Sequence, residues 1–156
     1  MSKFNFFWNG PFSQWAKSPF EIDGVKFNTC EQYMMYKKAM LFKDSSIAQE
    51  ILKTSDPRKQ KSLGRQVKNF DDSVWMVHAY NYVVEGNRAK FSQNDELATL
   101  LKATCGQTLV EASPYDRRWG IGMMEGDIGI EDPKNWHGEN LLGKAITQVR
   151  LEMFGD

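Results

Sequence analysis

Metal ligands and thiols are scarce in this sequence. Its 156 residues include two cysteines, Cys30 and Cys105, and two histidines, His78 and His137. Neither pair has the close spacing of zinc ligands, so the sequence predicts no metal site. We expect both thiols to be reduced, as is usual for a cytoplasmic protein.

Neither an excess of one charge nor a long apolar run is present. Lysine and arginine total 20, as do aspartate and glutamate, so the formal net charge is zero. Nonspecific nucleic-acid binding draws affinity from excess positive charge, so that function is disfavoured, although a local basic patch stays open. No apolar run approaches a membrane span, and polar residues interrupt the aromatic N-terminus. We therefore expect a soluble, cytoplasmic protein with no membrane partner.

The composition of the chain is that of an ordinary globular protein and is rich in aromatic residues. Hydrophobic residues make up 41% of the chain and charged residues 26%, as in typical soluble proteins. A chain of this length buries roughly two thirds of its unfolded surface, and we expect residues 1–156 to form a single compact domain. The five tryptophans suit either a core or a stacking pocket.

Turn and spacing signals predict a mainly α-helical domain with a small β-hairpin and short strands. Asp23-Gly24 lies within the alternating segment 20–27, which is typical of a two-residue hairpin. We expect a short strand at 108–112, and a helix disturbed at Gly86. Apolar spacing and capping residues predict helices near 29–42, 74–91, 95–104 and 141–154, with shorter helices that begin near 45 and 57.

A long loop over 113–138 opens with an unusual mixture of residues. Asp116, Arg117 and Trp119 follow one another closely, among glycines, directly after the strand. A carboxylate beside guanidinium groups and a flat ring suits an anionic or sugar-bearing ligand, and loops of this length are usually functional or disordered. The alternative is a surface loop in which the aspartate simply pairs with an arginine.

Glu31 and Lys38 are seven residues apart on one predicted helix, and so they share a face. That face also carries Met34 and Met35. Two charged groups there are costly unless the face lines a cleft, which makes both residues candidates for a site. The alternative for Glu31 is a capping box with Asn28, three residues before it.

Trp75 and the pair Arg88 and Lys90 are further candidates on the helix 74–91. Trp75 is either a core residue or a stacking wall for a base or a ribose. Arg88 and Lys90, which flank Ala89, either bind a phosphate or lie at a solvated helix end.

Two further segments offer ligand contacts. Phe12 and Trp15 either pin the N-terminus to the core or cover a ligand, with Ser13 and Gln14 as hydrogen-bonding partners. Asn140 begins the last helix, where it either caps the helix or leaves amide groups exposed to an anion.

Taken together, these stretches resemble the YbiA-like, or NADAR, family over nearly the whole chain. The order and spacing of several short motifs carry the resemblance, and no single motif does. The motifs are Phe12-Ser13-Gln14-Trp15, residues 28–35, Asp56-Pro57, Leu63-Gly64-Arg65, Val74-Trp75, residues 87–91, residues 110–122 and Asn140-Leu141-Leu142-Gly143.

The resemblance implies a compact, mainly helical fold and hydrolysis of N-glycosidic bonds. Branches of the family act on phosphorylated ribosylamino-pyrimidine intermediates of riboflavin synthesis or in ADP-ribose chemistry, including removal of ADP-ribose from guanine. It also implies essential roles for Glu31, Trp75 and Asp116, and favours Lys38. The implied enzyme takes a small ribosyl phosphate or ADP-ribosyl substrate and needs no cofactor.

Cleavage of a ribose C1–N bond leaves positive charge on the sugar and negative charge on the departing nitrogen, which two carboxylates can share. We assign the sugar side to Glu31 and the acid or base role to Asp116, with stacking by Trp75 and Trp119. Arg88, Lys90 or Arg117 would neutralise phosphate. Alternatively, a neutral Lys38 captures the aldehyde of a ring-opened ribose as a Schiff base.

Two other functions stay open at this point. A non-catalytic module that binds ADP-ribose or NAD would keep the aromatic and arginine contacts but would need neither carboxylate. An enzyme that acts on ADP-ribosylated nucleic acid would share the chemistry and would need a basic track beside the cleft. The sequence predicts no oligomeric state.

Overall fold

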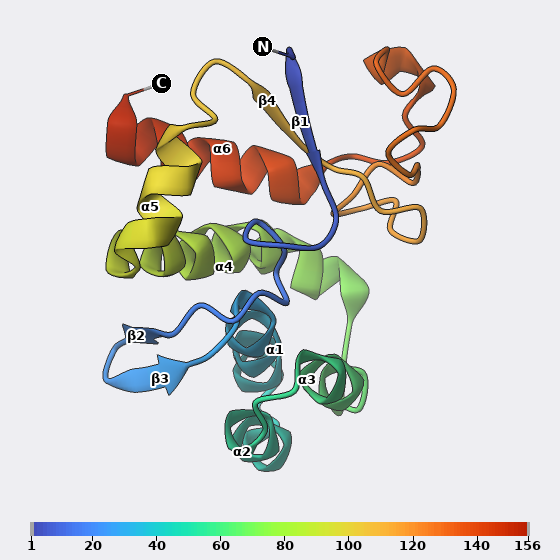
Figure 1. Ribbon diagram of the computed structural model, residues 1–156. Coiled ribbons are helices and arrows are strands. Elements are labelled where there is room, and N and C mark those ends of the chain that lie inside the picture. The colour runs from blue at the N-terminus through green and yellow to red at the C-terminus, as the bar shows by residue number, and fades with distance from the viewer. Residues whose placement is uncertain (1, 156) are drawn as a thin grey trace. The chain divides into compact units, whose positions relative to one another are not determined.

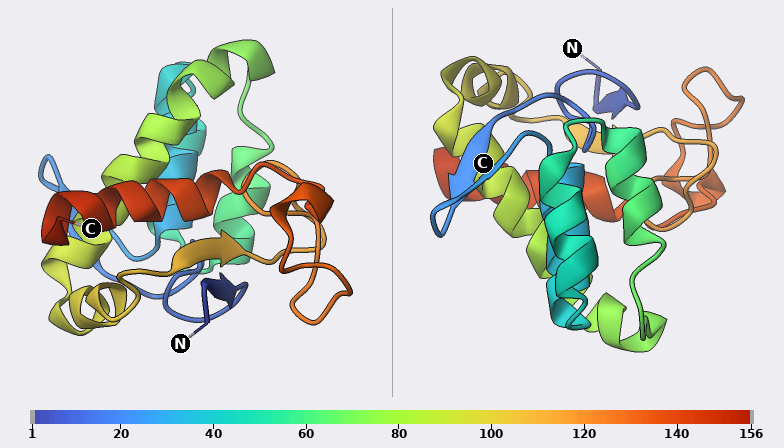
Figure 2. Two further views of the ribbon diagram at one scale, coloured as in Figure 1. Left: turned by 90° about the horizontal axis from the view of Figure 1, so that it is seen from above. Right: turned by 90° about the horizontal axis from the view of Figure 1, so that it is seen from below.

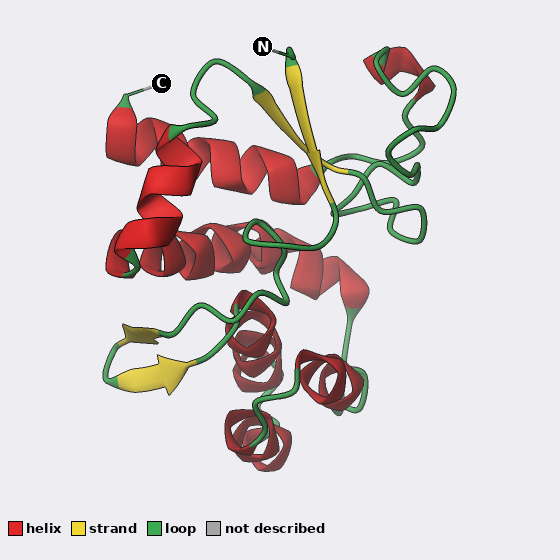
Figure 3. Cartoon of the chain, viewed as in Figure 1, coloured by secondary structure: helices red, strands yellow, loops and turns green. Residues whose placement is uncertain are grey.

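The computed structural model describes residues 2–155, and within them the expected mainly helical fold is confirmed (Figure 1, Figure 3). The strands are β1 (Phe4–Phe7), β2 (Phe20–Ile22), β3 (Val25–Phe27) and β4 (Thr108–Glu111). The helices are α1 (Cys30–Leu41), α2 (Ser45–Lys53), α3 (Pro57–Gly64), α4 (Asp72–Gln93), α5 (Asp95–Lys102), η1 (Pro133–Asn135, a 3₁₀ turn) and α6 (Leu141–Phe154).

The chain divides into two compact units. The central unit comprises residues 14–94, and the terminal unit comprises the chain up to Ser13 together with the chain from Asp95 onward. Each unit has a hydrophobic cluster of its own. A single domain over residues 1–156 stays a prediction.

The central unit is built around α1. Helices α1, α2 and α3 lie side by side, α4 crosses them, and α1 packs against the other three (Figure 1, Figure 2). The approach of α3 to α1 requires a glycine, because a Cβ at Gly64 would lie 2.0 Å from Met35 Sδ. The hairpin β2–β3 turns at Asp23 and Gly24, which both have positive φ, as the Asp-Gly signal predicts.

Helix α4 continues without a break through Gly86, so the expected disturbance is wrong. The glycine serves packing there: a Cβ would lie 3.1 Å from Cδ2 of Tyr33 on α1. The smallest side chain therefore lets α4 lie close to α1 at a modest cost in helix propensity.

The terminal unit pairs a strand near the N-terminus with a strand from the second half of the chain. Strand β1 runs parallel to β4, with Phe4 opposite Thr108 and Phe7 opposite Glu111, and α6 packs against β4 (Figure 1). The sequence did not predict β1, because its Phe-Asn-Phe-Phe run lacks a clear alternation and its partner lies far along the chain. Phe4 and Val110 of this pair belong to the cluster that also contains Ile121.

Two features are absent from the described residues 2–155, a membrane-spanning helix and a cluster of metal ligands. No helix in residues 2–155 is long and apolar enough to cross a membrane. In the same part of the chain, no group of three or more His, Cys, Asp or Glu side chains is placed to hold a metal ion.

Candidate functional site

Residues other than Glu31 cap the N-terminus of α1. Thr29 is the N-cap, and its Oγ1 accepts a hydrogen bond from the Gln32 amide at 3.0 Å. Gln32 reaches back, and its Oε1 accepts from the Asn28 amide at 2.7 Å. This exchange resembles a capping box shifted by one residue, so the capping role considered for Glu31 is wrong.

Glu31 is instead a buried carboxylate next to a tryptophan. Only 7% of the residue is exposed, and Trp15 donates its indole N–H to Glu31 Oε1 over 3.4 Å. A backbone hydrogen bond also joins this residue to the segment that carries Trp15, because the Glu31 amide donates to the Gln14 carbonyl at 3.0 Å. Trp15 itself is 40% exposed, so one of its sides faces solvent beside the carboxylate.

Lys38 lies two turns further along α1 against aromatic faces. Its Nζ is 4.4 Å from the centroid of the Phe70 ring and 5.9 Å from that of Trp75. Trp75 is buried and also contacts the ring of Tyr82 at 5.9 Å. Trp75 is therefore a core residue whose ring also faces Lys38, and its stacking on a base or a ribose stays a prediction.

The ionisation of Lys38 reflects this half-buried position. Burial lowers the pKa of the ammonium below its ordinary value, the charges of Glu31 and Asp72 oppose the shift, and Arg65 adds to it. Glu31 and Lys38 both lie on α1, seven residues apart, so they share a face of that helix as predicted. The arrangement favours a lysine that loses its proton more readily than a surface lysine does.

Gln14 connects this face to α4. Its Oε1 accepts from the side-chain amide of Asn87 at 2.9 Å, and Asn87 is fully buried. No sequence pattern singles out Asn87, because only its contact with Gln14 reveals its position. Gln14 is thereby fixed by Asn87 at its side chain and by Glu31 at its carbonyl.

Arg88 and Lys90 do not form one phosphate site. Arg88 is exposed, whereas Lys90 is completely buried, because residues two apart point to different sides of a helix. Burial lowers the pKa of Lys90, and the nearby Cys30 opposes that shift. Phosphate binding by Lys90 would require that buried group to become accessible.

In the terminal unit, Asp116 is bound to backbone and not to an arginine. Its Oδ1 accepts from the amides of Arg118, at 2.9 Å, and Trp119, at 2.8 Å. Its second oxygen, Oδ2, accepts no hydrogen bond from residues 2–155, and Asp116 is half-buried. The interpretation as a simple aspartate–arginine pair is therefore wrong.

The loop around Asp116 is held by a ladder of backbone hydrogen bonds. Carbonyls of residues 117–121 accept from amides of residues 137–142, among them Arg118 O from Leu141 N at 3.2 Å and Trp119 O from Leu142 N at 3.1 Å. The amides of Leu141 and Leu142, at the start of α6, are thus occupied by loop carbonyls. The ladder also fixes the segment that carries Arg117 and Trp119, of which Arg117 is exposed and Trp119 is half-buried.

Asn140 occupies the N-cap position of α6, but its side chain makes no capping bond. Its Oδ1 accepts from the Glu111 amide at 2.9 Å, and its Nδ2 donates to the Leu109 carbonyl at 3.0 Å. The residue has a left-handed backbone conformation with φ of 54° and is 4% exposed. Capping by its side chain is therefore wrong, since both polar groups bind the strand β4.

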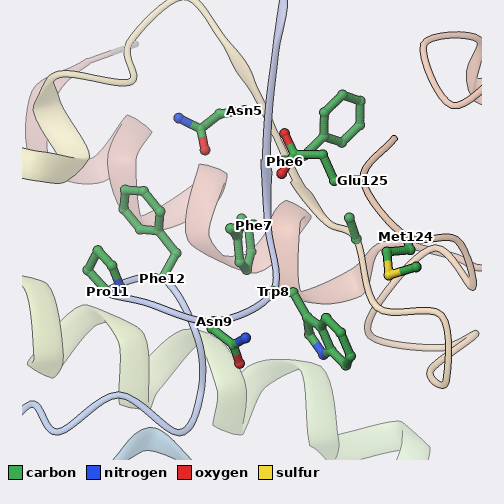
Figure 4. Close-up of a pocket in the computed structure, with 10 residues that line it drawn as sticks. Asn5, Phe6, Phe7, Trp8, Asn9, Pro11, Phe12, Met124 and Glu125 are labelled. Atoms are coloured by element: carbon green, nitrogen blue, oxygen red, sulfur yellow. The ribbon is translucent and has the colours of Figure 1, made fainter. Parts of the chain in front are cut away.

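Phe12 and Ser13 belong to the terminal unit. Phe12 is buried edge-on against Phe7, with ring centroids 5.8 Å apart. The Ser13 amide closes a turn by donating to the Gly10 carbonyl at 3.0 Å. Phe12 also lines a cavity of about 510 Å³ beside β1 (Figure 4).

Comparison with known proteins decides the family. The sequence model of the NADAR domain matches residues 6–154. The chain belongs to the NADAR domain family. The resemblance found in the sequence motifs is thereby confirmed.

Relatives of this NADAR domain include named N-glycosidases, which are hydrolases that act on N-glycosyl bonds. It is 44% identical over 147 residues to N-glycosidase R617 of Acanthamoeba polyphaga mimivirus, and the match covers 90% of this chain and 86% of that one. It is 42% identical over 132 residues to Protein irg-1 of Caenorhabditis elegans, and the match covers 83% of this chain and 62% of that protein.

A solved structure confirms the fold. The NMR structure of the Escherichia coli protein YbiA matches this NADAR domain with a TM-score of 0.80 and 29% identity. The match covers 98% of this chain and 86% of that one. The curated E. coli sequence carries the name N-glycosidase YbiA.

Proposed function

We propose that this NADAR domain is an N-glycosidase that hydrolyses the bond between ribose C1 and a base nitrogen. Its substrate is a phosphorylated ribosylamine or an ADP-ribosyl compound, including ADP-ribosyl-guanine. The observation that carries the proposal is the face of α1, where the buried Glu31 carboxylate lies beside Trp15 and shares its side of the helix with Lys38. The names of the mimivirus and E. coli relatives support the reaction class.

Glu31 serves the sugar in this proposal. As the C1–N bond lengthens, positive charge develops on the ribose, and a fixed carboxylate in a poorly solvated place stabilises that charge more strongly than water does. Trp15 and Trp75 offer rings for the sugar or the base. A water molecule then adds its hydroxyl to C1 and its proton passes to the departing nitrogen.

Asp116 is proposed as the acid or base for that proton. Two backbone amides fix its Oδ1, which leaves Oδ2 as the oxygen that can exchange a proton with the substrate. The loop is suited to the role because the backbone ladder orders it before any ligand binds. Arg117 and Arg88, which are both exposed, are the better candidates for phosphate, since Lys90 is buried.

Lys38 supports a second course of the reaction. Its lowered pKa increases the fraction of neutral amine, which can add to the aldehyde of a ring-opened ribose and release water as the Schiff base forms. Water then hydrolyses the Schiff base and restores the lysine. Borohydride added during turnover should leave a substrate-dependent adduct on Lys38, and active turnover without an adduct would exclude this course.

The reaction itself is tested with a substrate panel and mass spectrometry. The panel contains ribosylamine phosphates, ADP-ribose conjugates and ADP-ribosylated DNA, and Glu31→Gln serves as the control for a contaminating enzyme. We expect base release from at least one member by the wild type and none by the variant. Binding of ADP-ribose without product over long incubation would contradict the proposal and favour a non-catalytic module that binds ADP-ribose or NAD.

A further inference from the structure

Asn87 joins α4 to the segment that carries Trp15. Its Nδ2 donates one hydrogen bond to the Val83 carbonyl, four residues back in the helix, at 2.8 Å, and one to Gln14 Oε1 at 2.9 Å. Because the Val83 carbonyl can only accept, it fixes which way the Asn87 amide points, and Gln14 must then present its oxygen. The orientation of the Gln14 side chain is therefore set by α4.

Gln14 and its neighbour Trp15 in turn contact Glu31. The Gln14 carbonyl accepts from the Glu31 amide at 3.0 Å, and an amide in the first turn of a helix has no partner within that helix. Trp15 donates its indole N–H to Glu31 Oε1 over 3.4 Å. Both the backbone and the carboxylate of Glu31 therefore depend on where residues 14 and 15 lie.

The pair of Gln14 and Asn87 is less completely bonded than another buried amide of the central unit. Within residues 2–155, the buried atoms Gln14 Nε2 and Asn87 Oδ1 have no hydrogen-bond partner. Gln60, in contrast, is fully buried and has hydrogen bonds at both its oxygen and its nitrogen. A buried pair with one donor and one acceptor unmatched stabilises a fold less than a fully bonded amide does, so stability alone does not explain the pair.

We infer that Asn87 is a positioning residue for the N-glycosidase reaction, which keeps Trp15 and Glu31 in their places through Gln14. Asn87 is fully buried, so it acts through Gln14 and not on the substrate itself. A displacement of about 1 Å in a reacting group can lower turnover about 100-fold, so a carboxylate that must face the ribose requires a fixed support. This role rests on the proposed N-glycosidase function.

Asn94 offers a matched control at the end of the same helix. It lies seven residues beyond Asn87, and its Nδ2 donates to the Lys90 carbonyl, again four residues back, at 2.8 Å and to the Pro19 carbonyl at 3.0 Å. Asn94→Leu therefore also removes one hydrogen bond within α4 and one to the segment before β2, but it leaves the contact with Gln14 in place.

Amide hydrogen exchange, NMR of the tryptophan indoles and steady-state kinetics test this role. In Asn87→Leu we expect the Glu31 amide to exchange about tenfold faster and the Trp15 indole resonance to move. With the panel member that the wild type cleaves, kcat per folded molecule should fall about tenfold while KM stays within about twofold. Asn94→Leu should lower Tm by about 4 °C and leave these readouts at their wild-type values.

Gln14→Met serves as a second variant if Asn87→Leu does not fold. It removes the contact from the other side and leaves the Asn87 bond to the Val83 carbonyl in place, and it should change exchange, indole resonance and kcat in the same way. Wild-type kcat and wild-type exchange of the Glu31 amide in the folded variant would overturn the role. An equal loss of kcat in Asn94→Leu would overturn it as well.

Amide exchange and the indole resonance need no substrate, so the two proposals can fail separately. Faster exchange at Glu31 in Asn87→Leu, in a chain whose wild type cleaves no panel member, would reject the N-glycosidase function and keep the link from Asn87 to Glu31. Conversely, wild-type turnover that Asn87→Leu retains in full would reject only the positioning role.

Discussion

The polar side chains of the central and terminal units have different tasks. In the central unit, Glu31 and Lys38 project from a helix whose own backbone is hydrogen-bonded, and capping is left to Thr29 and Gln32. In the terminal unit, Asn140 and one oxygen of Asp116 are bound to the backbone itself. The side chains of Glu31 and Lys38 are thus not needed for the backbone hydrogen bonds of their helix, whereas Asn140 and Asp116 stabilise the backbone of the terminal unit.

This difference predicts separable effects of substitution. Changes at the face of α1 should alter turnover and leave the free energy of unfolding nearly constant. Changes in the loop should alter stability first, and turnover only where a group has a free oxygen. Asp116 is the residue at which the two effects can be separated by choice of substituent.

The largest effect in the loop is expected at Asp116. Asp116→Asn removes the charge and keeps an Oδ1 that accepts from the two backbone amides, so turnover should fall about 100-fold or more with little change in Tm. Asp116→Ala should lose the same activity and, in addition, about 1 kcal/mol of stability. Asp127→Asn, whose Oδ2 accepts from the Met124 amide in another turn, is the control for both measurements. Wild-type turnover in Asp116→Asn would remove Asp116 from the proposed chemistry.

Gly138→Ala should be the most destabilising single change in the ladder. A Cβ there would lie 2.3 Å from the Gly120 carbonyl oxygen and 2.8 Å from the Arg117 Cα, and backbone cannot move aside easily. We expect a loss of about 3 kcal/mol in urea denaturation. Gly126→Ala has a positive φ but open space, so it should lose only about 1 kcal/mol of strain. Equal losses in the two variants would show that the ladder is looser than described.

Thr29→Ala tests the cap of α1 apart from Glu31. Its Oγ1 accepts from the Gln32 amide and donates to Gln60 Oε1 at 2.7 Å, so its removal should cost about 2 kcal/mol. Turnover per folded molecule should stay near the wild-type value. Ser46→Ala, at an exposed position in the first turn of α2, should change stability by only a few tenths of a kcal/mol. A loss of turnover at full stability in Thr29→Ala would connect the cap to the chemistry.

The smallest effect concerns Lys38 and pH. Because burial holds the pKa of Lys38 below its ordinary value of 10.5 in the folded chain, the unfolded chain binds more protons between these two values. Wild-type stability should therefore rise with pH across that window, by an amount that Lys38→Met lacks. Denaturation at several pH values up to 10.5 measures the difference. The control is Lys59→Met, at an exposed position on α3, which should keep the wild-type dependence.

Local signals predicted the hairpin and the helices well. The Asp23-Gly24 turn and the start of α3 at Asp56-Pro57 depend on short-range backbone preferences, which the residues themselves express. Strand β1 was missed because a parallel partner supplies its hydrogen bonds from far along the chain. Contacts between distant parts of the chain also explain which features of the candidate site could not be predicted.

Residue types alone made Glu31 and Lys38 candidates for a site, because two charges on an apolar helix face are unusual. They did not show that Asn140 binds Leu109 and Glu111, or that Asn87 holds Gln14, since each contact joins distant parts of the chain. Lys90 shows the converse limit: a lysine at a helix end is normally solvated, yet tertiary packing buries this one completely.

The contrast between the two units is tested most directly by measuring turnover and the free energy of unfolding together for Glu31→Gln and Asn140→Ala. We expect Glu31→Gln to lose about 1000-fold in turnover at nearly wild-type stability. Asn140→Ala should lose about 2 kcal/mol of stability and keep its turnover per folded molecule. Wild-type turnover in Glu31→Gln, or loss of turnover without loss of stability in Asn140→Ala, would contradict this difference between the two units.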